Sequence, residues 1–300
     1  MKIPFFSIVI PVYNRSEILE QRLTYLMKQE FTDFEVIIVD DGSTDHPEKK
    51  LASLIEIYPN IRLISQPNSE RGAARNNGIR NSEGEYIVLF DSDDFMHKDH
   101  LSKLHKGILK NNFPDFIATK FNFRNEDGKI FNSDISNYKE GTYNYSLFLN
   151  GNPLACNISF KRNLKDLNYF IEDRSFAIKE DWMFLISNLR NHKLILLDDL
   201  TISMFDHSDR SMKSNNKIIV ERTIKATEWI RNNIDLTVSE LNKLYSHRNY
   251  FCGIHSYLDG DRTQAISFSI KAIFKGGLKG KYLTLLAKSI VGRKLILKFK

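Results

Sequence analysis

Short apolar runs alternate with helical patterns over the first 114 residues of the chain. The runs are rich in β-branched residues, as buried strands are, and the segments between them repeat apolar residues at helical spacing. The predicted strands are residues 5–13, 34–40, 61–65 and 86–90, and the predicted helices are residues 15–30, 46–58 and 72–82. This alternation predicts an α/β fold, with a parallel sheet covered by helices on both faces.

The first predicted helix carries a start signal. Asn14 is followed by Glu17, which resembles a capping box, with the amide oxygen at the N-cap and the carboxylate three residues later. We therefore expect Asn14 to cap this helix.

The pattern changes after about residue 115. Residues 115–133 indicate two strands around an Asp-Gly turn, and residues 194–207 indicate two strands split by Asp198 and Asp199. They predict an antiparallel extension of the sheet, with a helix over 179–189 between them. From about residue 214 the pattern is helical, so the chain is expected to divide into residues 1–213 and 214–300.

Polar clusters follow three of the predicted strands. They are Tyr13 with Asn14, Asp40 with Asp41, and the run from Asp91 to Asp94. In a parallel sheet, ligands bind beyond the carboxyl ends of the strands. These clusters therefore predict a ligand site at that edge.

Three aspartates, Asp91, Asp93 and Asp94, lie within four positions. Carboxylates this close repel one another unless a cation lies between them, and Mg²⁺ or Mn²⁺ takes such oxygen ligands. These ions keep open positions that diphosphate oxygens fill, so the cluster predicts a divalent metal and a nucleotide diphosphate. The alternative is structural, because strand-end residues such as Asp94 or Asp99 also cap helices.

Two further segments fit a nucleotide ligand. In VDDGSTD, residues 39–45, Asp40 and Asp41 offer oxygens to a base or a ribose hydroxyl, and Gly42 lets the chain turn close to the ligand. Arg71 and Arg75 stand near a helix start, where guanidinium and backbone N–H groups favour anions. Taken separately, the VDDGSTD segment fits a surface turn as well, and the two arginines fit solvated charges.

With these segments in order, the sequence resembles the family 2 glycosyltransferases of bacterial cell-surface polysaccharide type. The resemblance covers about residues 5–211 and is carried by SIVIPVYN (7–14), VDDGSTD (39–45), GAARNNGI (72–79), EGEYIVLFDSDD (83–94), EDW (180–182) and HSDRS (207–211). It implies the GT-A fold, a Rossmann-like mixed sheet flanked by helices, here with a helical C-terminal extension. Residues 1–114 would form the nucleotide-binding half and residues 115–213 the acceptor-binding half.

The resemblance also implies a reaction. It is a metal-dependent, inverting transfer of a sugar from a nucleotide-diphospho-sugar, most often a UDP-sugar, to a hydroxyl of a glycan or lipid-linked glycan. The family's D-x-D motif maps to Asp91-Ser92-Asp93, extended by Asp94, and the metal is expected on Asp93 or Asp94, with the choice open. Asp181 takes the place of the catalytic base, which removes a proton from the attacking hydroxyl. The other expected substrate contacts are Pro11, Tyr13, Asn14, Asp41, Arg71, Arg75, Asp91, Ser92, Glu180, Trp182, His207 and Ser211.

Charge adds a separate expectation for the C-terminal end. The net charge is +6, and 10 of the 43 Lys and Arg residues lie in 262–300, where there is no Asp or Glu. Aromatic and aliphatic residues are interleaved with these cations, as in interfacial segments attracted to anionic lipid. We expect peripheral association with the inner face of the cell membrane and no nucleic acid partner; a solvated basic helix is the alternative.

Composition limits the remaining possibilities. No apolar run approaches the 18 residues of a membrane span, and the N-terminus reaches Pro4 too early for a signal peptide, so a cytoplasmic location is expected. Cys156 and Cys252 lie far apart and predict neither a disulfide framework nor a zinc site.

Two other function classes fit parts of the pattern. A sugar nucleotidyltransferase is disfavoured, because the chain lacks a glycine-rich, lysine-bearing N-terminal loop. A non-catalytic nucleotide-sugar or glycan-binding module at the membrane is the second alternative. No motif in residues 124–175 identifies the donor sugar, the acceptor or the linkage, and none fixes the oligomeric state.

Overall fold

The computed structural model describes residues 3–206 and 215–293. The chain forms two compact units. The sheet unit comprises Met1–Asn144, Pro153–Arg174 and Asn191–His207, and the helical unit comprises Tyr145–Asn152, Ser175–Arg190 and Ser208–Lys300. The functional division at residue 213 stays a prediction.

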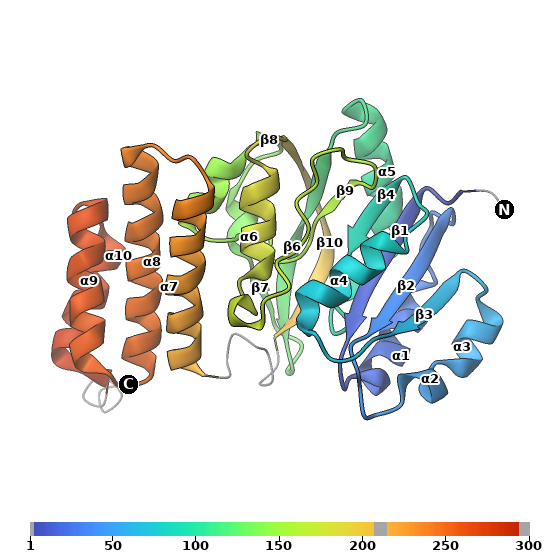
Figure 1. Ribbon diagram of the computed structural model, residues 1–300, viewed down its shortest axis with the longest axis horizontal. Helices are drawn as coiled ribbons and strands as arrows, with labels where there is room; N and C mark the ends of the chain where they lie inside the picture. The colour runs from blue at the N-terminus through green and yellow to red at the C-terminus, as the bar shows by residue number, and fades with distance from the viewer. Residues whose placement is uncertain (1–2, 207–214, 294–300) are drawn as a thin grey trace. The chain divides into compact units, whose positions relative to one another are not determined.

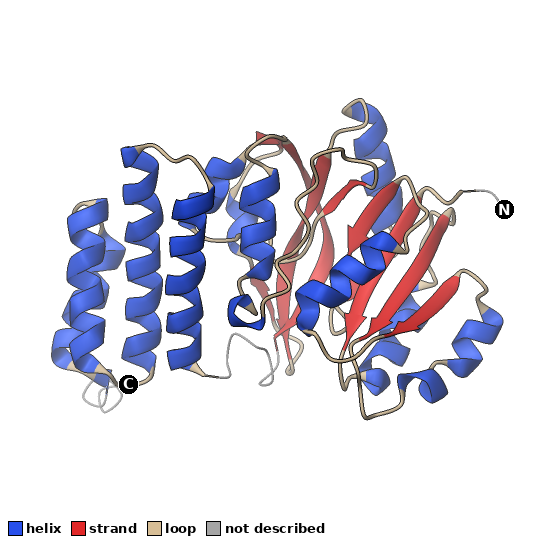
Figure 2. Ribbon diagram, in the orientation of Figure 1, coloured by secondary structure: helices blue, strands red, loops and turns tan. Residues whose placement is uncertain are grey.

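All the strands of the described residues belong to one mixed sheet in the sheet unit (Figures 1 and 2). The main path has the order β3-β2-β1-β4-β9-β6-β10-β5, with β7 paired to β6 and β8 paired to β10. The strands are β1 (Phe6–Val12), β2 (Phe34–Asp40), β3 (Ile61–Ser65), β4 (Tyr86–Leu89), β5 (Phe95–Met96), β6 (Phe116–Asn125), β7 (Ile130–Asn132), β8 (Gly141–Tyr143), β9 (Ser159–Lys161) and β10 (Leu194–Asp206).

The N-terminal part of the sheet is parallel, as predicted. β1 lies between β2 and β4 and pairs in parallel with both, and β2 pairs in parallel with β3. All seven residues of β1 and of β2 are buried, which is why their sequences are continuous apolar runs. The predicted antiparallel extension is confirmed in part: β6 pairs antiparallel with β7, and β9 lies antiparallel between β4 and β6, but β10 pairs in parallel with β6.

Helices cover both faces of this sheet. They are α1 (Ser16–Leu26), α2 (Pro47–Lys50), α3 (Ala52–Ile57), α4 (Glu70–Arg80) and α5 (His100–Lys110). In Figure 1, α4 lies across the front of the parallel strands. Gly78 allows this close packing, because a Cβ atom there would lie 2.3 Å from Val9 Cγ1. The chain passes from β1 to β2 through α1, and from β3 back past β2 and β1 to β4 through α4, so the two connections cross the sheet in opposite directions. Because such connections are right-handed, α1 and α4 lie on opposite faces of the sheet.

Three local predictions were wrong. Residues 46–58 form two short helices separated at Leu51. Leu194–Asp206 form one strand, β10, where two were predicted over 194–207, and its pairing with β6 shifts register between Leu196 and Ile202. Such a bulge absorbs extra residues without ending the strand. Asn14 does not cap α1, which begins after Arg15 without a side-chain cap from its own N-cap residue.

The helical unit contains α6 (Glu180–Asn188), α7 (Asn216–Asn233), α8 (Val238–Leu258), α9 (Arg262–Gly276) and α10 (Gly280–Val291). Short 3₁₀ turns lie at Asp134–Asn137, Tyr145–Asn150 and Arg174–Phe176. Figure 1 shows α7, α8 and α9 as neighbouring rods in that order. Thr237 and Glu240 form a capping box at α8, and Asn215 and Asp261 cap α7 and α9. Across the described ranges, no helix is long and apolar enough to cross a bilayer.

Candidate functional site

The predicted clusters after β1 and β2 meet at the carboxyl edge of the sheet. Val12 is in register with Asp40, and the Asp41 amide donates to the Val12 carbonyl at 2.9 Å. Asn14 has φ of 51°, and its Oδ1 accepts a hydrogen bond from the Thr44 amide at 2.7 Å. Asn14 therefore fastens the 39–45 turn to the end of β1 instead of capping α1.

Asp41 is the centre of this edge. Its carboxylate is 3% exposed, and Oδ1 accepts hydrogen bonds from Gln66 Nε2 and from the Ser69 amide, both at 2.8 Å. One aspartate thus joins the end of β2, the end of β3 and the start of α4. Two donors on one oxygen fix the orientation of the carboxylate.

Gly42 is needed for the turn beside Asp41. Its φ is +75°, and a Cβ atom would lie 2.7 Å from the Asn68 amide nitrogen. Backbone this close leaves no room for a side chain, so the turn itself requires a glycine here, and the predicted close approach to a ligand stays a prediction. Tyr13, the residue after β1, is 49% exposed, so its ring is accessible to solvent.

Arg75 does not stand at an exposed helix start. It lies in the second turn of α4, is 1% exposed, and its Nη2 donates to Asp91 Oδ1 at 2.8 Å. Its guanidinium also lies 5.4 Å from the ring centroid of Phe170. Arg75 therefore neutralises the first aspartate of the cluster, whereas Arg71 lies within the first turn of α4.

The other two aspartates are held by different groups. Asp93 forms an ion pair with Arg15, and its carbonyl accepts a hydrogen bond from Arg22 Nε at 3.2 Å. Asp94 is 5% exposed, and its Oδ1 accepts from the Phe205 amide at 3.1 Å. Ser92, between them in the motif, is 5% exposed.

These contacts correct one premise of the metal prediction. The aspartates do not need a metal ion as their sole counter-charge, because Arg75 and Arg15 neutralise Asp91 and Asp93. The oxygen chemistry still fits a hard divalent cation. Within the described residues, no group of three His, Cys, Asp or Glu side chains surrounds one point, so an ion would take one or two carboxylates and complete its shell elsewhere.

A strap over residues 168–174 is a part of the sheet unit that sequence reasoning missed. Asn76 is fully buried; it donates to the Phe170 carbonyl at 2.8 Å and accepts from the Phe170 amide at 2.9 Å. At the other end of the strap, Arg174 donates to the carbonyl of Asn68. The strap thus covers Arg75 and holds the loop that follows β3. Asn76 stands within the motif GAARNNGI, but nothing in the sequence indicated its partner, 94 residues away.

The predicted base lies in the helical unit. Asp181 is the second residue of α6; its Oδ2 accepts from Asn152 Nδ2 at 3.0 Å and its Oδ1 from the Trp182 amide at 2.8 Å. Asp181 is half-buried, whereas Glu180 is 3% exposed. Asn152 was not predicted, and no motif around it could have revealed it.

Burial shapes the surroundings of Asp181. Trp182 is buried and donates its Nε1 to the Phe148 carbonyl at 2.8 Å. Lys179, the residue before α6, is 8% exposed, with Nζ 4.2 Å from the ring centroid of Phe251. Burial lowers the pKa of Lys179 below its ordinary value, and the Asp181 charge opposes that shift.

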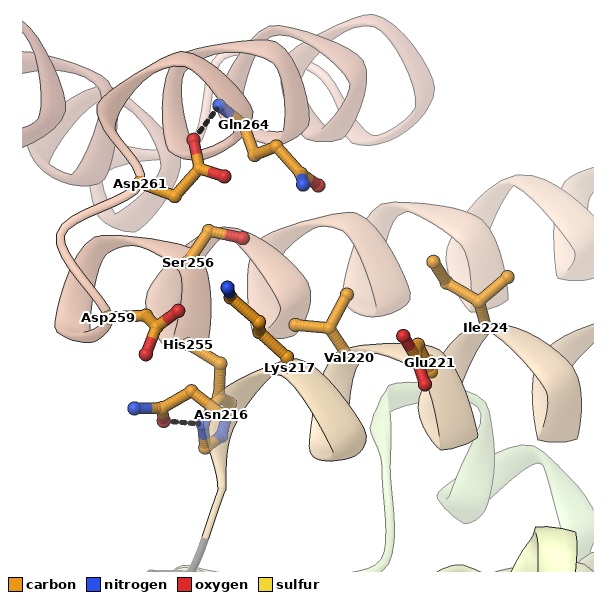
Figure 3. A pocket seen from close by; sticks show the side chains of 10 residues that line it. All are labelled: Asn216, Lys217, Val220, Glu221, Ile224, His255, Ser256, Asp259, Asp261 and Gln264. Atoms are coloured by element: carbon orange, nitrogen blue, oxygen red, sulfur yellow. Dashed lines mark hydrogen bonds between the residues drawn. The ribbon is translucent and has the colours of Figure 1, made fainter.

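Two predicted contacts, His207 and Ser211, lie outside the described residues. Figure 3 shows a separate pocket of about 220 Å³ in the helical unit, between α7, the end of α8 and the start of α9. There, His255 Nδ1 lies 2.8 Å from Asn216 Oδ1, and Asp261 accepts from the Gln264 amide. None of the predicted site residues lines this pocket.

Comparison with known proteins agrees with the motif pattern. The model of "Glycosyl transferase family 2" matches residues 7–167, more than half of the chain. An uncharacterized glycosyltransferase of Rickettsia felis is 38% identical over 135 residues, which are 45% of this chain and 22% of that protein. The chondroitin synthase of Escherichia coli is 41% identical over 98 residues, 33% of this chain and 14% of that protein. The chain thus spans less than a quarter of the length of either relative.

Solved structures show the same fold. Residues 1–349 of S. aureus TarS, in complex with UDP-GlcNAc, match with a TM-score of 0.67 at 22% identity, covering 98% of this chain and 89% of that one. The mannosyltransferase PcManGT from Pyrobaculum calidifontis, in complex with GDP-Man and Mn²⁺, matches with a TM-score of 0.59 at 15% identity, covering 99% and 87%. The predicted GT-A fold with a helical C-terminal extension is confirmed.

Proposed function

Because the chain belongs to glycosyl transferase family 2, we propose that it transfers a sugar from a nucleotide-diphospho-sugar to a glycan or lipid-linked glycan hydroxyl, with inversion. The observation that carries the proposal is the carboxyl edge of the sheet. Asp41 follows β2, whereas Asp91, Asp93 and Asp94 follow β4, and each carboxylate is oriented by its own donor. A preorganised polar edge beyond parallel strands supports the proposal of a nucleotide site there.

The donor is proposed to bind this edge through the nucleotide. Asp41 would accept from the base or ribose, beside Pro11, Tyr13 and Asn14, and the exposed ring of Tyr13 offers a stacking surface. Arg71, Asp91 and Ser92 would contact the sugar-diphosphate, while buried Arg75 would keep Asp91 in place. UDP is the preferred nucleotide, since a TarS structure holds UDP-GlcNAc; PcManGT holds GDP-Man, so GDP belongs in the test.

A divalent ion fits the oxygen donors of Asp93 and Asp94. When bound, Mn²⁺ or Mg²⁺ would supply positive charge against the diphosphate leaving group. Arg15, paired with Asp93, is a protein cation at the same carboxylate. His207 and Ser211 stay predictions for the closing of the donor site.

Asp181 is the proposed general base. An alcohol is a weak nucleophile at neutral pH, and a carboxylate that accepts its proton as the new bond forms makes the attack possible. Asn152 holds one oxygen of Asp181 and the Trp182 amide the other, so the side chain is fixed in direction. Glu180 and Trp182 would support the acceptor or the base.

The cellular role follows from the relatives. The chondroitin synthases of E. coli and Pasteurella multocida, and a hyaluronan synthase of P. multocida, are named for polysaccharide products. We therefore propose that the reaction belongs to bacterial cell-surface polysaccharide synthesis. From the basic C-terminal region we further propose that the protein is peripheral on the inner face of the membrane, with an anionic lipid surface as a partner.

The decisive experiment measures nucleotide release from a panel of UDP-, GDP- and TDP-sugars with and without Mn²⁺. One donor is expected to be hydrolysed in a metal-stimulated reaction. Asp181→Asn should lower transfer by about 10²- to 10⁴-fold, the usual contribution of a general base, with UDP binding unchanged by calorimetry. Asp235→Asn, an exposed carboxylate of the same unit, is the matched control. Unchanged turnover in Asp181→Asn removes this residue from the role; tight UDP binding without any turnover favours the non-catalytic binding module.

A further inference from the structure

The α9–α10 hairpin presents apolar side chains to solvent at its apex, residues 274–281. Phe274 is 84% exposed and Leu278 is 79% exposed. On α9, Ala265, Ser269 and Ala272 face the interior. Ile270, 53% exposed, lies on the outer face one turn before Phe274, so the apolar surface continues from the helix onto the apex.

Charge on this hairpin has one sign. Residues 262–293 contain seven Lys or Arg and no Asp or Glu, whereas α7 and α8 carry both signs. Lys271 and Lys275 flank the outer face of α9, and Lys279 and Lys281 follow Leu278. Four lysines therefore flank the apolar apex along the chain, and no carboxylate of the hairpin neutralises them.

The apex has a fixed shape. Gly276 packs so closely that a Cβ atom there would lie 2.7 Å from Ser246 Cβ and from Tyr282 Cε2. Tyr282 is 1% exposed, lies on Tyr250 with ring centroids 5.3 Å apart, and donates to Ser246 Oγ at 3.3 Å. Gly277, with φ of +77°, ends α9. Because the turn is anchored to α8, Phe274 and Leu278 cannot fold back to bury themselves.

We propose that this apex is a membrane-docking element whose partner is an anionic lipid bilayer. Phe274 and Leu278 enter the boundary between headgroups and acyl chains, and the lysines contact lipid phosphates and carboxylates. The charge pattern selects this partner, since a surface with apolar points and only cations complements an anionic sheet with an apolar interior. The inference rests on the membrane partner of the proposed function and names the residues that make the contact.

The test uses the full chain and sedimentation with vesicles of phosphatidylcholine, with or without phosphatidylserine. Wild type is expected to bind only the phosphatidylserine vesicles, and less at high salt because ions screen the lysines. Phe274→Ser/Leu278→Ser should lower the partition coefficient by at least about ten-fold, given the apolar area lost. Lys275→Gln/Lys279→Gln should lower it by several-fold, with a weaker salt dependence.

Val238→Ser is the matched control, because Val238 is 76% exposed in the same unit but lies outside the hairpin. It should bind vesicles as wild type does, and all variants should keep the wild-type circular dichroism spectrum and rate of donor hydrolysis.

Three outcomes overturn the inference. Wild-type binding by the Phe274→Ser/Leu278→Ser variant removes the apex as the docking element and leaves the membrane partner standing. No binding of wild type removes both, while donor hydrolysis still tests the enzyme. A change of oligomeric state in the variant, seen by light scattering without any change in vesicle binding, shows that the apex contacts a second copy of the chain.

Discussion

The carboxyl edge of the sheet and the α9–α10 hairpin both concentrate charge, but the charges at the edge are paired and largely buried, whereas those on the hairpin are exposed and of one sign. At the edge, Asp41, Arg75 and Asp94 are each 5% exposed or less, and each has a hydrogen-bond partner within 3.1 Å. On the hairpin, the lysines around Phe274 are exposed and no acidic residue is near them in sequence. Buried, paired charges fix the position of a small ligand, whereas exposed charges of one sign attract an extended surface.

Removal of one cation from each region gives the sharpest contrast. Arg75→Met should lower the free energy of unfolding of the sheet unit by about 3 kcal/mol, because it removes the buried partner of a charge-assisted hydrogen bond to the partly exposed Asp91. Lys275→Met should leave stability unchanged. Urea unfolding followed by circular dichroism measures both, and Arg75→Met/Asp91→Asn should recover part of the loss. Equal effects of the two single substitutions would contradict the contrast.

Buried histidines make the helical unit sensitive to acid. Burial, aided by the charges of Lys281 and Lys179, lowers the pKa of His247 to about 3. The folded state therefore keeps a neutral ring while the unfolded chain takes up a proton below about pH 6.5. The stability contribution is complete above that pH and is lost as the pH falls towards 3, by about 3 kcal/mol at pH 4.

Fluorescence reports this loss selectively, because both tryptophans, Trp182 and Trp229, lie in the helical unit. His247→Phe should reduce the acid sensitivity, and His46→Gln, on the surface of the sheet unit, should not. Identical acid transitions in wild type and His247→Phe would exclude His247 as the cause.

Asn152 separates positioning from folding in the helical unit. Asn152→Ala should lower the turnover number about ten-fold and leave the KM for the donor unchanged, because Asp181 loses the hydrogen bond that orients one of its oxygens. Asn233→Ala, which removes an exposed amide hydrogen bond in the same unit, should change neither. A lower rate that comes with a lower free energy of unfolding in urea would indicate a purely structural role for Asn152.

Backbone strain gives the smallest expected effect. Glu70 opens α4 with φ of +72°, a left-handed conformation that costs a non-glycine residue about 1 kcal/mol or more. In the hairpin, by contrast, glycine occupies such positions, at Gly277 and Gly292. Glu70→Gly should stabilise the sheet unit by less than about 1 kcal/mol in urea unfolding, because the relief of strain is partly offset by the unfolded-chain entropy of glycine and by the loss of the 3.6 Å ion pair with Arg174. Glu70→Gln keeps the strain and should give no gain.

Much of the fold could be predicted because its signals are local. The strands of the parallel half are continuous apolar runs, since burial on both faces leaves no polar position, and α7 to α9 follow the predicted 3.6-residue pattern. The errors arose where a contact with a distant residue replaced a local one. The sequence predicted that Asn14 caps a helix, but its side-chain oxygen accepts a hydrogen bond from the Thr44 amide. The break at Leu51 and the bulge in β10 likewise have no local signal.

The candidate site divides in the same way. Motif spacing was sufficient to select Asp41, Asp91, Asp93, Asp94 and Asp181 as site residues, and their roles remain proposals. It gave no indication of the groups that hold them. Arg15, Asn76 and Asn152 act through contacts with residues 78, 94 and 29 positions away, and no pattern along the chain encodes such pairs.

Sequence alone determined the fold class, the family and the positions of the carboxylates, because these depend on burial period and on residue order. Only the tertiary structure decided which cation neutralises which aspartate, which side chain orients Asp181, and that Phe274 and Leu278 stay in solvent. Those outcomes depend on which atoms come into contact when segments far apart in the sequence pack together, and no local pattern of residues specifies these contacts.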